Sequence, residues 1–406
     1  MTAATVAQAV DGLPQRLSGL SACRWLPAAS AAGISAALGA VAAVWFTAGE
    51  PSASAIGAVA GCASYLAGRT ARGLAGPQFG AWPRTARERA AGQVSGAAVE
   101  AAIVAALAAG GTAAGQPGLW RLAIIVLILL TIRQVASACS DPQPDGPREA
   151  SLEGFVWRVL AFPPGGQILL VAVVTPVWGS QAALTGLAWW SVVALASMIV
   201  TRGAVPAEVR PVPAWRDDGP VATWLGRLVQ GQLVPLPPAL TGLAGVCVLA
   251  VLGLRGLPGF LLITPVIAML LASVGASHPH DGRLDWLTPA LLLAGQYVYL
   301  AAAGFASGVP LALVFLLCAL IALHYRALTA GVPAGLALGW DGRMLVAGLG
   351  AALGLATLAY VLLTGYIAVL VVRALRARRG PRRAAGARAA GSRPDGAAHI
   401  PVISGQ

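Results

Sequence analysis

Long apolar runs, separated by short polar segments, follow one another along most of the chain. Most of them are about 20 residues long, the length of helix that crosses a bilayer at about 1.5 Å per residue. The runs are continuous and do not alternate, which predicts helices and not the strands of a transmembrane barrel. We expect about eleven spans, with approximate limits at 27–48, 52–68, 95–115, 118–138, 166–182, 184–201, 234–254, 257–276, 286–305, 308–324 and 345–372.

The predicted fold class is therefore all-α, a polytopic integral membrane bundle of about 10–12 transmembrane helices. A long polar stretch at 202–233 separates about six spans from about five. The domains predicted from this division are a cytoplasmic N-terminal segment 1–26, a six-helix domain 27–201, a C-terminal membrane domain 202–375 and an arginine-rich tail 376–406 that we expect to be disordered.

Composition supports the membrane interpretation. The chain has 57% hydrophobic and only 10% charged residues, with a mean hydropathy of +0.76. Soluble domains have about 25% charged residues, and a chain this apolar would expose too much hydrophobic surface as one soluble fold.

The net charge of +12 does not predict a nucleic-acid partner, because much of it lies in the tail. Arginines crowd between Arg373 and Arg393, where we expect them to contact anionic lipid headgroups. Arginine in place of lysine, together with abundant Ala and Gly, indicates a GC-rich bacterium. Membrane lipids are the first partners that the sequence predicts.

Arginine-rich segments predict the orientation of the bundle. Arginines lie at 69–94 and 202–233, whereas the turns at 49–51 and 116–117 have none. The positive-inside rule then places the N-terminus and most polar loops in the cytoplasm, at the bacterial inner membrane. Eleven spans would send the tail outside, so either one span is re-entrant or an extra crossing lies in 345–372, broken near Gly365, or in 327–340.

Two charged residues fall inside predicted spans. Glu100 lies near the start of 95–115 and Arg133 near the end of 118–138. A short turn makes these spans antiparallel neighbours, which sets the two side chains at the same depth. We predict an intramembrane ion pair; the alternative is that each side chain reaches separately to the headgroups.

A Gly-x-x-Ala-Arg sequence ends the second span, and another glycine follows it: these residues are Gly68, Ala71, Arg72 and Gly80. The pattern resembles the signature of CDP-alcohol phosphotransferases, D-x2-D-G-x2-A-R-x8-9-G-x3-D-x3-D. The resemblance implies six transmembrane helices with this motif at the cytoplasmic face. In that family four aspartates hold two divalent metals that polarise the CDP pyrophosphate, and one aspartate acts as base.

The family's carboxylates are largely missing here. Its four aspartate positions fall on Ser64, Ala67, Arg84 and Glu88. One carboxylate cannot hold two metals, and an arginine repels the cation it would replace. We therefore expect the family's fold without its chemistry at this site, and a divalent cation (Mg or Mn) only at a displaced site. The alternative is an interfacial loop whose arginines obey the positive-inside rule.

Four polar motifs follow in the second half: 216–220 (RDDGP), 277–286 (SHPHDGRLDW), 324–326 (HYR) and 339–343 (GWDGR). They resemble a membrane domain of unknown function in high-GC bacteria, which is typically fused behind a CDP-alcohol phosphotransferase domain. The resemblance covers roughly 205–375.

The same motifs carry residue types that bind phosphate or pyrophosphate, above all guanidinium groups. The candidate binding residues are Arg72, Arg283, Arg326, Arg343, Asp217, Asp218, Asp281, Asp285, Asp341, His278, His280 and His324. The alternative is that Asp281 pairs with Arg283 and Asp341 with Arg343, and that these groups cap helix ends. A proline between His278 and His280, and the lack of a third ligand, argue against a metal site there.

The sequence thus predicts a CDP-alcohol phosphotransferase-like membrane protein of phospholipid or phosphoglycan headgroup metabolism, with its catalytic residues unassigned. Two alternatives remain open. One is a non-catalytic scaffold that forms a homodimer, or a heterodimer with an active homologue. The other is a transporter of a lipid or small molecule.

Overall fold

A computed structural model describes residues 28–74, 86–139, 166–203, 217–229, 236–253, 266–267, 269–270, 284–331 and 338–376. Within these ranges the chain is helical and contains no strand. The first half forms the helices α2 (Ala28–Thr47), α3 (Pro51–Leu74), α4 (Ala86–Ala113), α5 (Leu119–Cys139) and α7 (Gly166–Gly203). The second half forms α8 (Pro220–Val229), α9 (Leu236–Gly253), the 3-10 turn η5 (Asp285–Leu287), α11 (Thr288–Ala306), α12 (Leu311–Thr329), α13 (Gly339–Ala352) and α14 (Ala356–Arg376).

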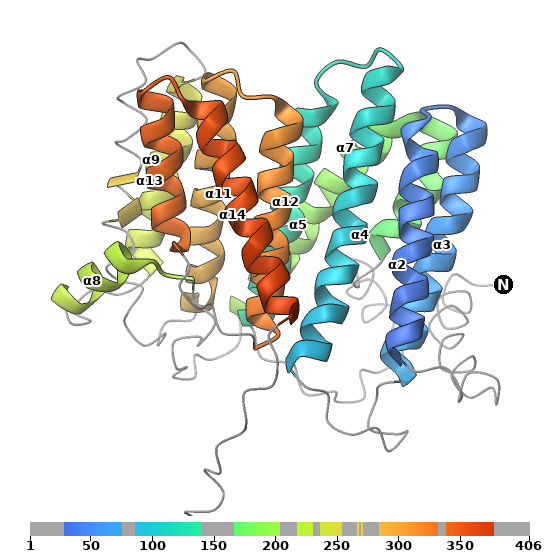
Figure 1. The fold of residues 1–406 in the computed structure, drawn as a ribbon, viewed down its shortest axis with the longest axis horizontal. Coiled ribbons are helices and arrows are strands. Elements are labelled where there is room, and N and C mark those ends of the chain that lie inside the picture. Colours follow the sequence, from blue (N-terminus) through green and yellow to red (C-terminus); the bar gives the residue numbers. More distant parts are fainter. Residues whose placement is uncertain are drawn as a thin grey trace, which may run out of the picture. The chain divides into compact units, whose positions relative to one another are not determined.

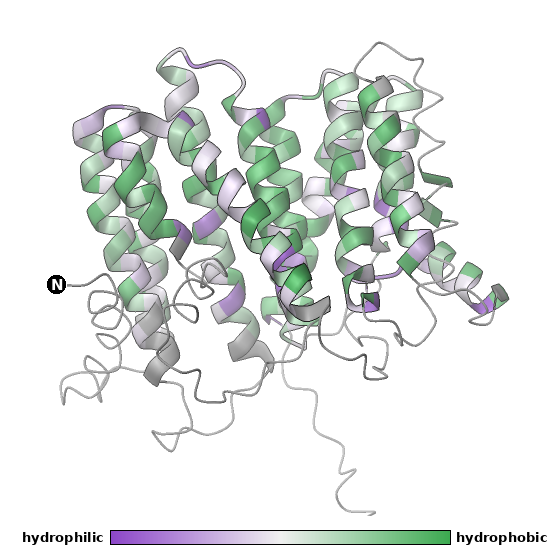
Figure 2. Cartoon of the chain, turned by 180° about the vertical axis from the view of Figure 1, so that it is seen from behind, coloured by the Kyte–Doolittle hydropathy of each residue, from purple (hydrophilic) through white to green (hydrophobic). Residues whose placement is uncertain are grey.

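Six helices in the described part of the chain are long and apolar enough to cross a membrane: α4, α5, α7, α11 with η5, α12 and α14. Many large apolar side chains on the bundle are exposed, among them Val59 at 71% and Val177 at 65%. Figure 2 shows hydrophobic colouring along the length of the helices. Lipid is the solvent for such a surface, and the protein is an all-α, multi-pass integral membrane protein.

Tight glycine turns join α2 to α3 and α4 to α5. Gly49 has a φ of +71°, and Gly115 and Gly118 each have a φ of +82°, which non-glycine residues rarely adopt. Small residues also allow the helices to approach closely. A Cβ on Gly110 of α4 would collide with the carbonyl oxygen of Phe46 in α2, a type of contact common in membrane bundles.

The predicted spans at 166–182 and 184–201 correspond to the two parts of α7, which meet at a break. The sequence predicted helices at 166–182 and 184–201 with a turn at 183, but Ala183 is helical and fully buried in α7. The break lies instead at Gly179, where φ is +82° and ψ is 176°. Glycine alone adopts that conformation without strain, so the break is displaced from the predicted turn.

One predicted span is two helices. The stretch 345–372 divides at 353–355, where Gly354 has a φ of +72°, and not near Gly365, which lies inside α14. Because α13 and α14 form a hairpin, the chain leaves α14 at the end of the bundle where α13 begins (Figure 1). The predicted break in 345–372 is thus present at a different glycine, and the extra membrane crossing stays a prediction.

The two halves pack directly on each other within one compact unit that extends to Leu375. Helices α4 and α5 contact α11 and α12. Trp120 of α5 meets Phe315 of α12 edge to face, with ring centroids 5.7 Å apart. Thr329 at the end of α12 donates a hydrogen bond to Gln93 near the start of α4, at 3.4 Å. The end of α12 and the start of α4 therefore lie at the same end of the bundle.

Candidate functional site: a buried Asp–Arg–His cluster

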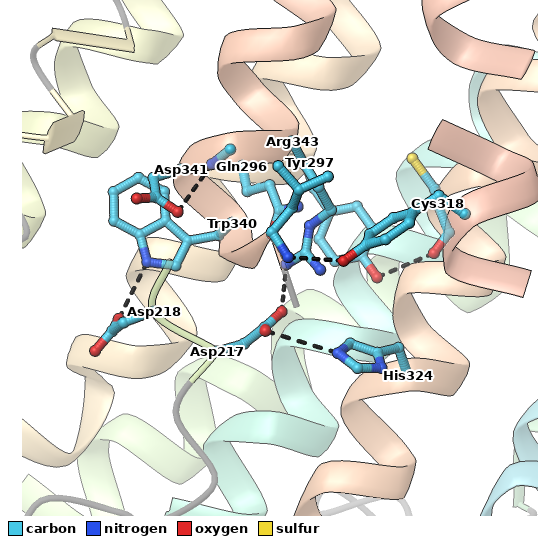
Figure 3. Close-up of polar contacts among 12 residues, drawn as sticks. Asp217, Asp218, Gln296, Tyr297, Cys318, His324, Trp340, Asp341 and Arg343 are labelled. Carbon is cyan, nitrogen blue, oxygen red and sulfur yellow. Dashed lines mark hydrogen bonds and ion pairs between the residues drawn. The ribbon is translucent and has the colours of Figure 1, made fainter. Parts of the chain in front are cut away.

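Asp217, His324 and Arg343 form a buried charged cluster at the end of the bundle where α13 begins (Figure 3). Arg343 donates a hydrogen bond from Nη2 to Asp217 Oδ2 at 2.5 Å. Nε2 of His324 lies 3.7 Å from Asp217 Oδ1, a distance typical of an ion pair and too long for a hydrogen bond. The exposed fractions are 4% for Asp217, 3% for His324 and 0% for Arg343.

Two glycines permit the close contact that brings Asp217 to α13. Gly339 has a φ of +67°, and a Cβ there would collide with the backbone of Gly219. A Cβ on Gly219 would in turn collide with Asp341 Oδ1. Only glycine at both positions lets segment 217–219 lie against the first turn of α13.

The motifs at 216–220 and 339–343 then bind each other. The Trp340 backbone N–H donates to Asp217 O at 3.1 Å, and its indole Nε1 donates to Asp218 Oδ1 at 3.1 Å. Asp341 Oδ2 accepts from the backbone N–H groups of Val221 and Ala222 at 3.0 and 2.9 Å, which caps the start of α8. Asp341 thus caps a helix, as the alternative predicted, but Arg343 pairs with Asp217 and not with Asp341.

Several polar atoms of the cluster make no hydrogen bond with any described residue. They are Nε and Nη1 of Arg343, both ring nitrogens of His324, Nε2 of Gln296 and Oδ1 of Asp217. Gln296 itself is fully buried on α11, and its Oε1 accepts a weak bond from Arg343 Nη2 at 3.4 Å. The buried Tyr325 hydroxyl also hydrogen-bonds Arg343, yet the donors without a partner outnumber the acceptors without one, which favours an additional acceptor.

Asp217 lies in the segment before α8, outside the membrane-spanning helices. Burial raises the pKa of this carboxyl, but the neighbouring Arg343 and His324 lower it, and the net pKa is below its ordinary value. Asp217 is thus an anion at neutral pH. Breaking a buried ion pair by removing one partner costs about 3–5 kcal/mol, because the other charge is left uncompensated.

Arg133 lies in a second buried polar group, formed by α4, α5 and α7. Its Nη2 donates to Gln167 Oε1 at 3.2 Å, while Gln134 Nε2 donates to Glu100 Oε2 at 2.9 Å. Glu100 and Arg326 both lie near enough to interact with Arg133 through their charges. Each of these two hydrogen bonds joins a charged group to a neutral amide, and the Glu100–Arg133 ion pair stays a prediction.

Two positions of the motif that resembles CDP-alcohol phosphotransferases, Ser64 and Gly68, lie where α3 contacts α2. Ser64 is buried and donates to Ser35 O of α2 at 2.7 Å, and Ser35 donates back to Ser64 O at 2.8 Å. Gly68 lies one turn further along, where a Cβ would sit 3.0 Å from Ser35 Oγ. At these two positions the motif packs α3 on α2.

The structure brings Asp217, Asp218, His324, Asp341 and Arg343 of the predicted binding residues together. Arg326 lies half-buried two residues after His324, and Asp285 is buried at the start of η5. Ala67 lies in α3, as do Ala71 and Arg72, and Glu88 lies in α4, but the side chains of Ala71, Arg72 and Glu88 are outside the described part. The residues wholly outside the described ranges are Gly80, Arg84, His278, His280, Asp281 and Arg283.

Gln296 is the cluster residue that the sequence analysis missed. The signal was present, because Gln296 is the one amide side chain in an otherwise apolar predicted span at 286–305. A buried amide in a membrane helix needs a polar partner from another helix. Among the described residues, no group of three or more His, Cys, Asp and Glu side chains is arranged to hold a metal ion.

The chain was also compared with known proteins. No family model, no curated protein and no solved structure matches it.

Proposed function

We propose that this protein acts in phospholipid or phosphoglycan headgroup metabolism at the bacterial inner membrane, by binding a phosphate-bearing anion at the Asp217–His324–Arg343 cluster. The single observation that carries the proposal is the burial of Arg343 without a full set of hydrogen bonds. Its guanidinium is completely buried, yet two of its three nitrogens make no hydrogen bond with a described residue.

A phosphate group fits this set of donors. Buried polar groups in proteins are almost always hydrogen-bonded, and a buried charge left partly unsatisfied is costly. Phosphate oxygens accept several bonds at once, and guanidinium is the side chain whose geometry suits them best. The His324 ring and Nε2 of Gln296 lie on other helices around the same guanidinium and add further donors.

Asp217 determines which nitrogens of Arg343 an anionic ligand can contact. As an anion it neutralises Arg343 when no ligand is present, and it repels a second negative charge at Nη2. A ligand phosphate would therefore approach the nitrogens that Asp217 leaves free. The site is thus suited to binding and orienting a headgroup, and it requires no metal for that step.

The experiment uses the full-length protein in lipid nanodiscs and native mass spectrometry. We expect it to retain phosphatidic acid or CDP-diacylglycerol in preference to uncharged diacylglycerol. The double variant Asp217→Asn/Arg343→Gln keeps the buried site electrically balanced and should lose about ten- to a hundredfold in affinity, the value of one to two charged hydrogen bonds. Arg121→Gln, at an exposed arginine on α5, is the matched control and should bind normally.

Equal retention of these lipids by the folded double variant and the unchanged protein would overturn the proposal. Free inorganic phosphate as competitor separates a lipid headgroup from a soluble phosphate. A metal-dependent release of CMP from CDP-diacylglycerol that Glu88→Ala abolishes would instead favour the metal chemistry of the CDP-alcohol phosphotransferases at 64–88.

A further inference from the structure

The short helix α8 presents three different surfaces around its axis. Ala222 and Gly226, four residues apart, are buried, and α8 packs on α13. Trp224 and Leu228, also four apart, are exposed at 61% and 67%. Residues four apart lie on one face of a helix, so these two side chains form one continuous apolar strip.

The remaining surface of α8 is polar. Thr223 and Arg227 are exposed and again four residues apart. At about 100° per residue, the polar strip lies about 100° around the helix from the strip that faces α13, and the apolar strip lies about 100° further on, nearly opposite α13. The helix therefore has a polar side, an apolar side and an attached side.

Hydrogen bonds to α13 determine where α8 lies along the bundle. Asp341 caps its first turn, and Trp340 holds the segment before it, so α8 starts beside the first turn of α13. Figure 1 shows α8 running outward from this end of the bundle. This is the end where α12 finishes and α4 begins.

We propose that α8 is an interfacial helix whose partner is the headgroup layer of the bilayer. Trp224 and Leu228 would face the acyl-chain boundary, and Arg227 would face the phosphates and water. Tryptophan is enriched at this depth, and amphipathic helices with a basic polar side lie in the interface plane. One arginine near anionic lipid contributes about 1 kcal/mol.

The proposal has a consequence for the buried cluster. Asp217 is three residues before the start of α8, and the same contacts with α13 hold both of them. Contact of α8 with lipid thus helps to hold Asp217 at Arg343. The inference concerns the surface of α8 and does not depend on a phosphate being bound at Arg343.

The test places a single cysteine on α8 in a full-length chain whose five native cysteines are replaced by alanine. Trp224→Cys carries a fluorophore on the apolar strip, and Arg227→Cys is the control on the polar strip. Nanodiscs contain lipids with a spin-label quencher either near the headgroup or near the end of the acyl chain. We expect the label at 224 to emit at shorter wavelength than the label at 227, and to be quenched most by the shallow quencher.

Three outcomes would overturn the proposal. The label at 224 could behave like the label at 227 in water, or be quenched most by the deep quencher. It could also be protected from aqueous iodide and yet unaffected by either lipid quencher, which would indicate a protein partner over α8. If Trp224→Cys fails to fold, Leu228→Cys reports on the same strip.

Discussion

Gly339 is the residue on which contact between segment 217–219 and α13 depends most directly. Its φ of +67° costs a non-glycine residue about 1–2 kcal/mol, and an added Cβ would also overlap the backbone of Gly219. Backbone cannot move aside as a flexible side chain can. The cost at this position therefore exceeds that of an ordinary helix glycine.

Gly339→Ala should destabilise the protein by at least about 1–2 kcal/mol and lower its thermal unfolding midpoint in detergent. Gly365→Ala is the control, because that glycine lies inside α14 with nothing within 4 Å of an added Cβ. It should be neutral or stabilising, since alanine favours the helix by up to about 1 kcal/mol. Equal midpoints for the two variants would contradict the structural role of Gly339.

Glu100 and Arg133 give a second prediction at this scale. Glu100→Gln keeps an oxygen that can accept the bond from Gln134, so the variant removes the charge and little else. If the two charges compensate each other, Glu100→Gln should destabilise more than Glu100→Gln combined with Arg133→Gln. We expect a coupling energy of about 0.5–3 kcal/mol in the double-mutant cycle. Strictly additive losses would show that there is no pair.

At the scale of elements, the carboxylate of Asp341 connects α13 to α8 through hydrogen bonds. It accepts two backbone bonds from α8 and one from Gly342 in its own helix, at 2.8 Å. The two donors of α8 depend on this carboxylate, whereas the Gly342 N–H also donates to Leu338 O at 3.2 Å. A ten-residue helix is too short to be stable in isolation, so α8 relies on this cap and on its packing.

Asp341→Ala should loosen α8 while the long helices stay intact. Losing the cap costs about 1–3 kcal/mol because buried N–H groups lose their acceptor. Hydrogen exchange followed by mass spectrometry should show faster exchange at 220–229 and unchanged exchange in α12. Arg121→Gln removes an exposed charge on α5, away from α8, and should leave exchange at 220–229 unaltered. The role of the cap fails if both variants exchange like the parent protein.

At the scale of the whole molecule, the hairpin of α13 and α14 determines which loops share a side. The arginine-rich ends near 74–86, the end of α12 and the start of α13 lie at one end of the bundle. The turns at 48–50, 114–118 and 353–355 lie at the other. The positive-inside rule predicts that the first group is cytoplasmic.

Single-cysteine labelling in cells tests this orientation. A cysteine at Arg227 should resist a membrane-impermeant maleimide until the membrane is opened, and one at Leu353, which is 71% exposed, should react from outside. Position 282 lies outside the described residues, but the same rule predicts that it is protected. External labelling at 227 or 282 would refute the cytoplasmic assignment.

Sequence alone was sufficient for the fold class and for most helix positions. The length of an apolar run and the local charge are properties of a segment, and the bilayer imposes the same length requirement on every span. The predicted spans 27–48 and 118–138 agree closely with α2 and α5. The turn between α13 and α14 and the break in α7 were misplaced because each depends on one glycine among many, and only backbone geometry distinguishes it.

The candidate site was decided by tertiary structure. Asp217 and Arg343 are 126 residues apart, and Gln296 comes from a third segment. The motifs were visible in the sequence, but no spacing rule says that Asp341 caps a helix while Asp217 pairs with an arginine. Those roles follow from which helices pack together and how close two glycines let them come, because a buried charge must be compensated by whatever group the packing places beside it.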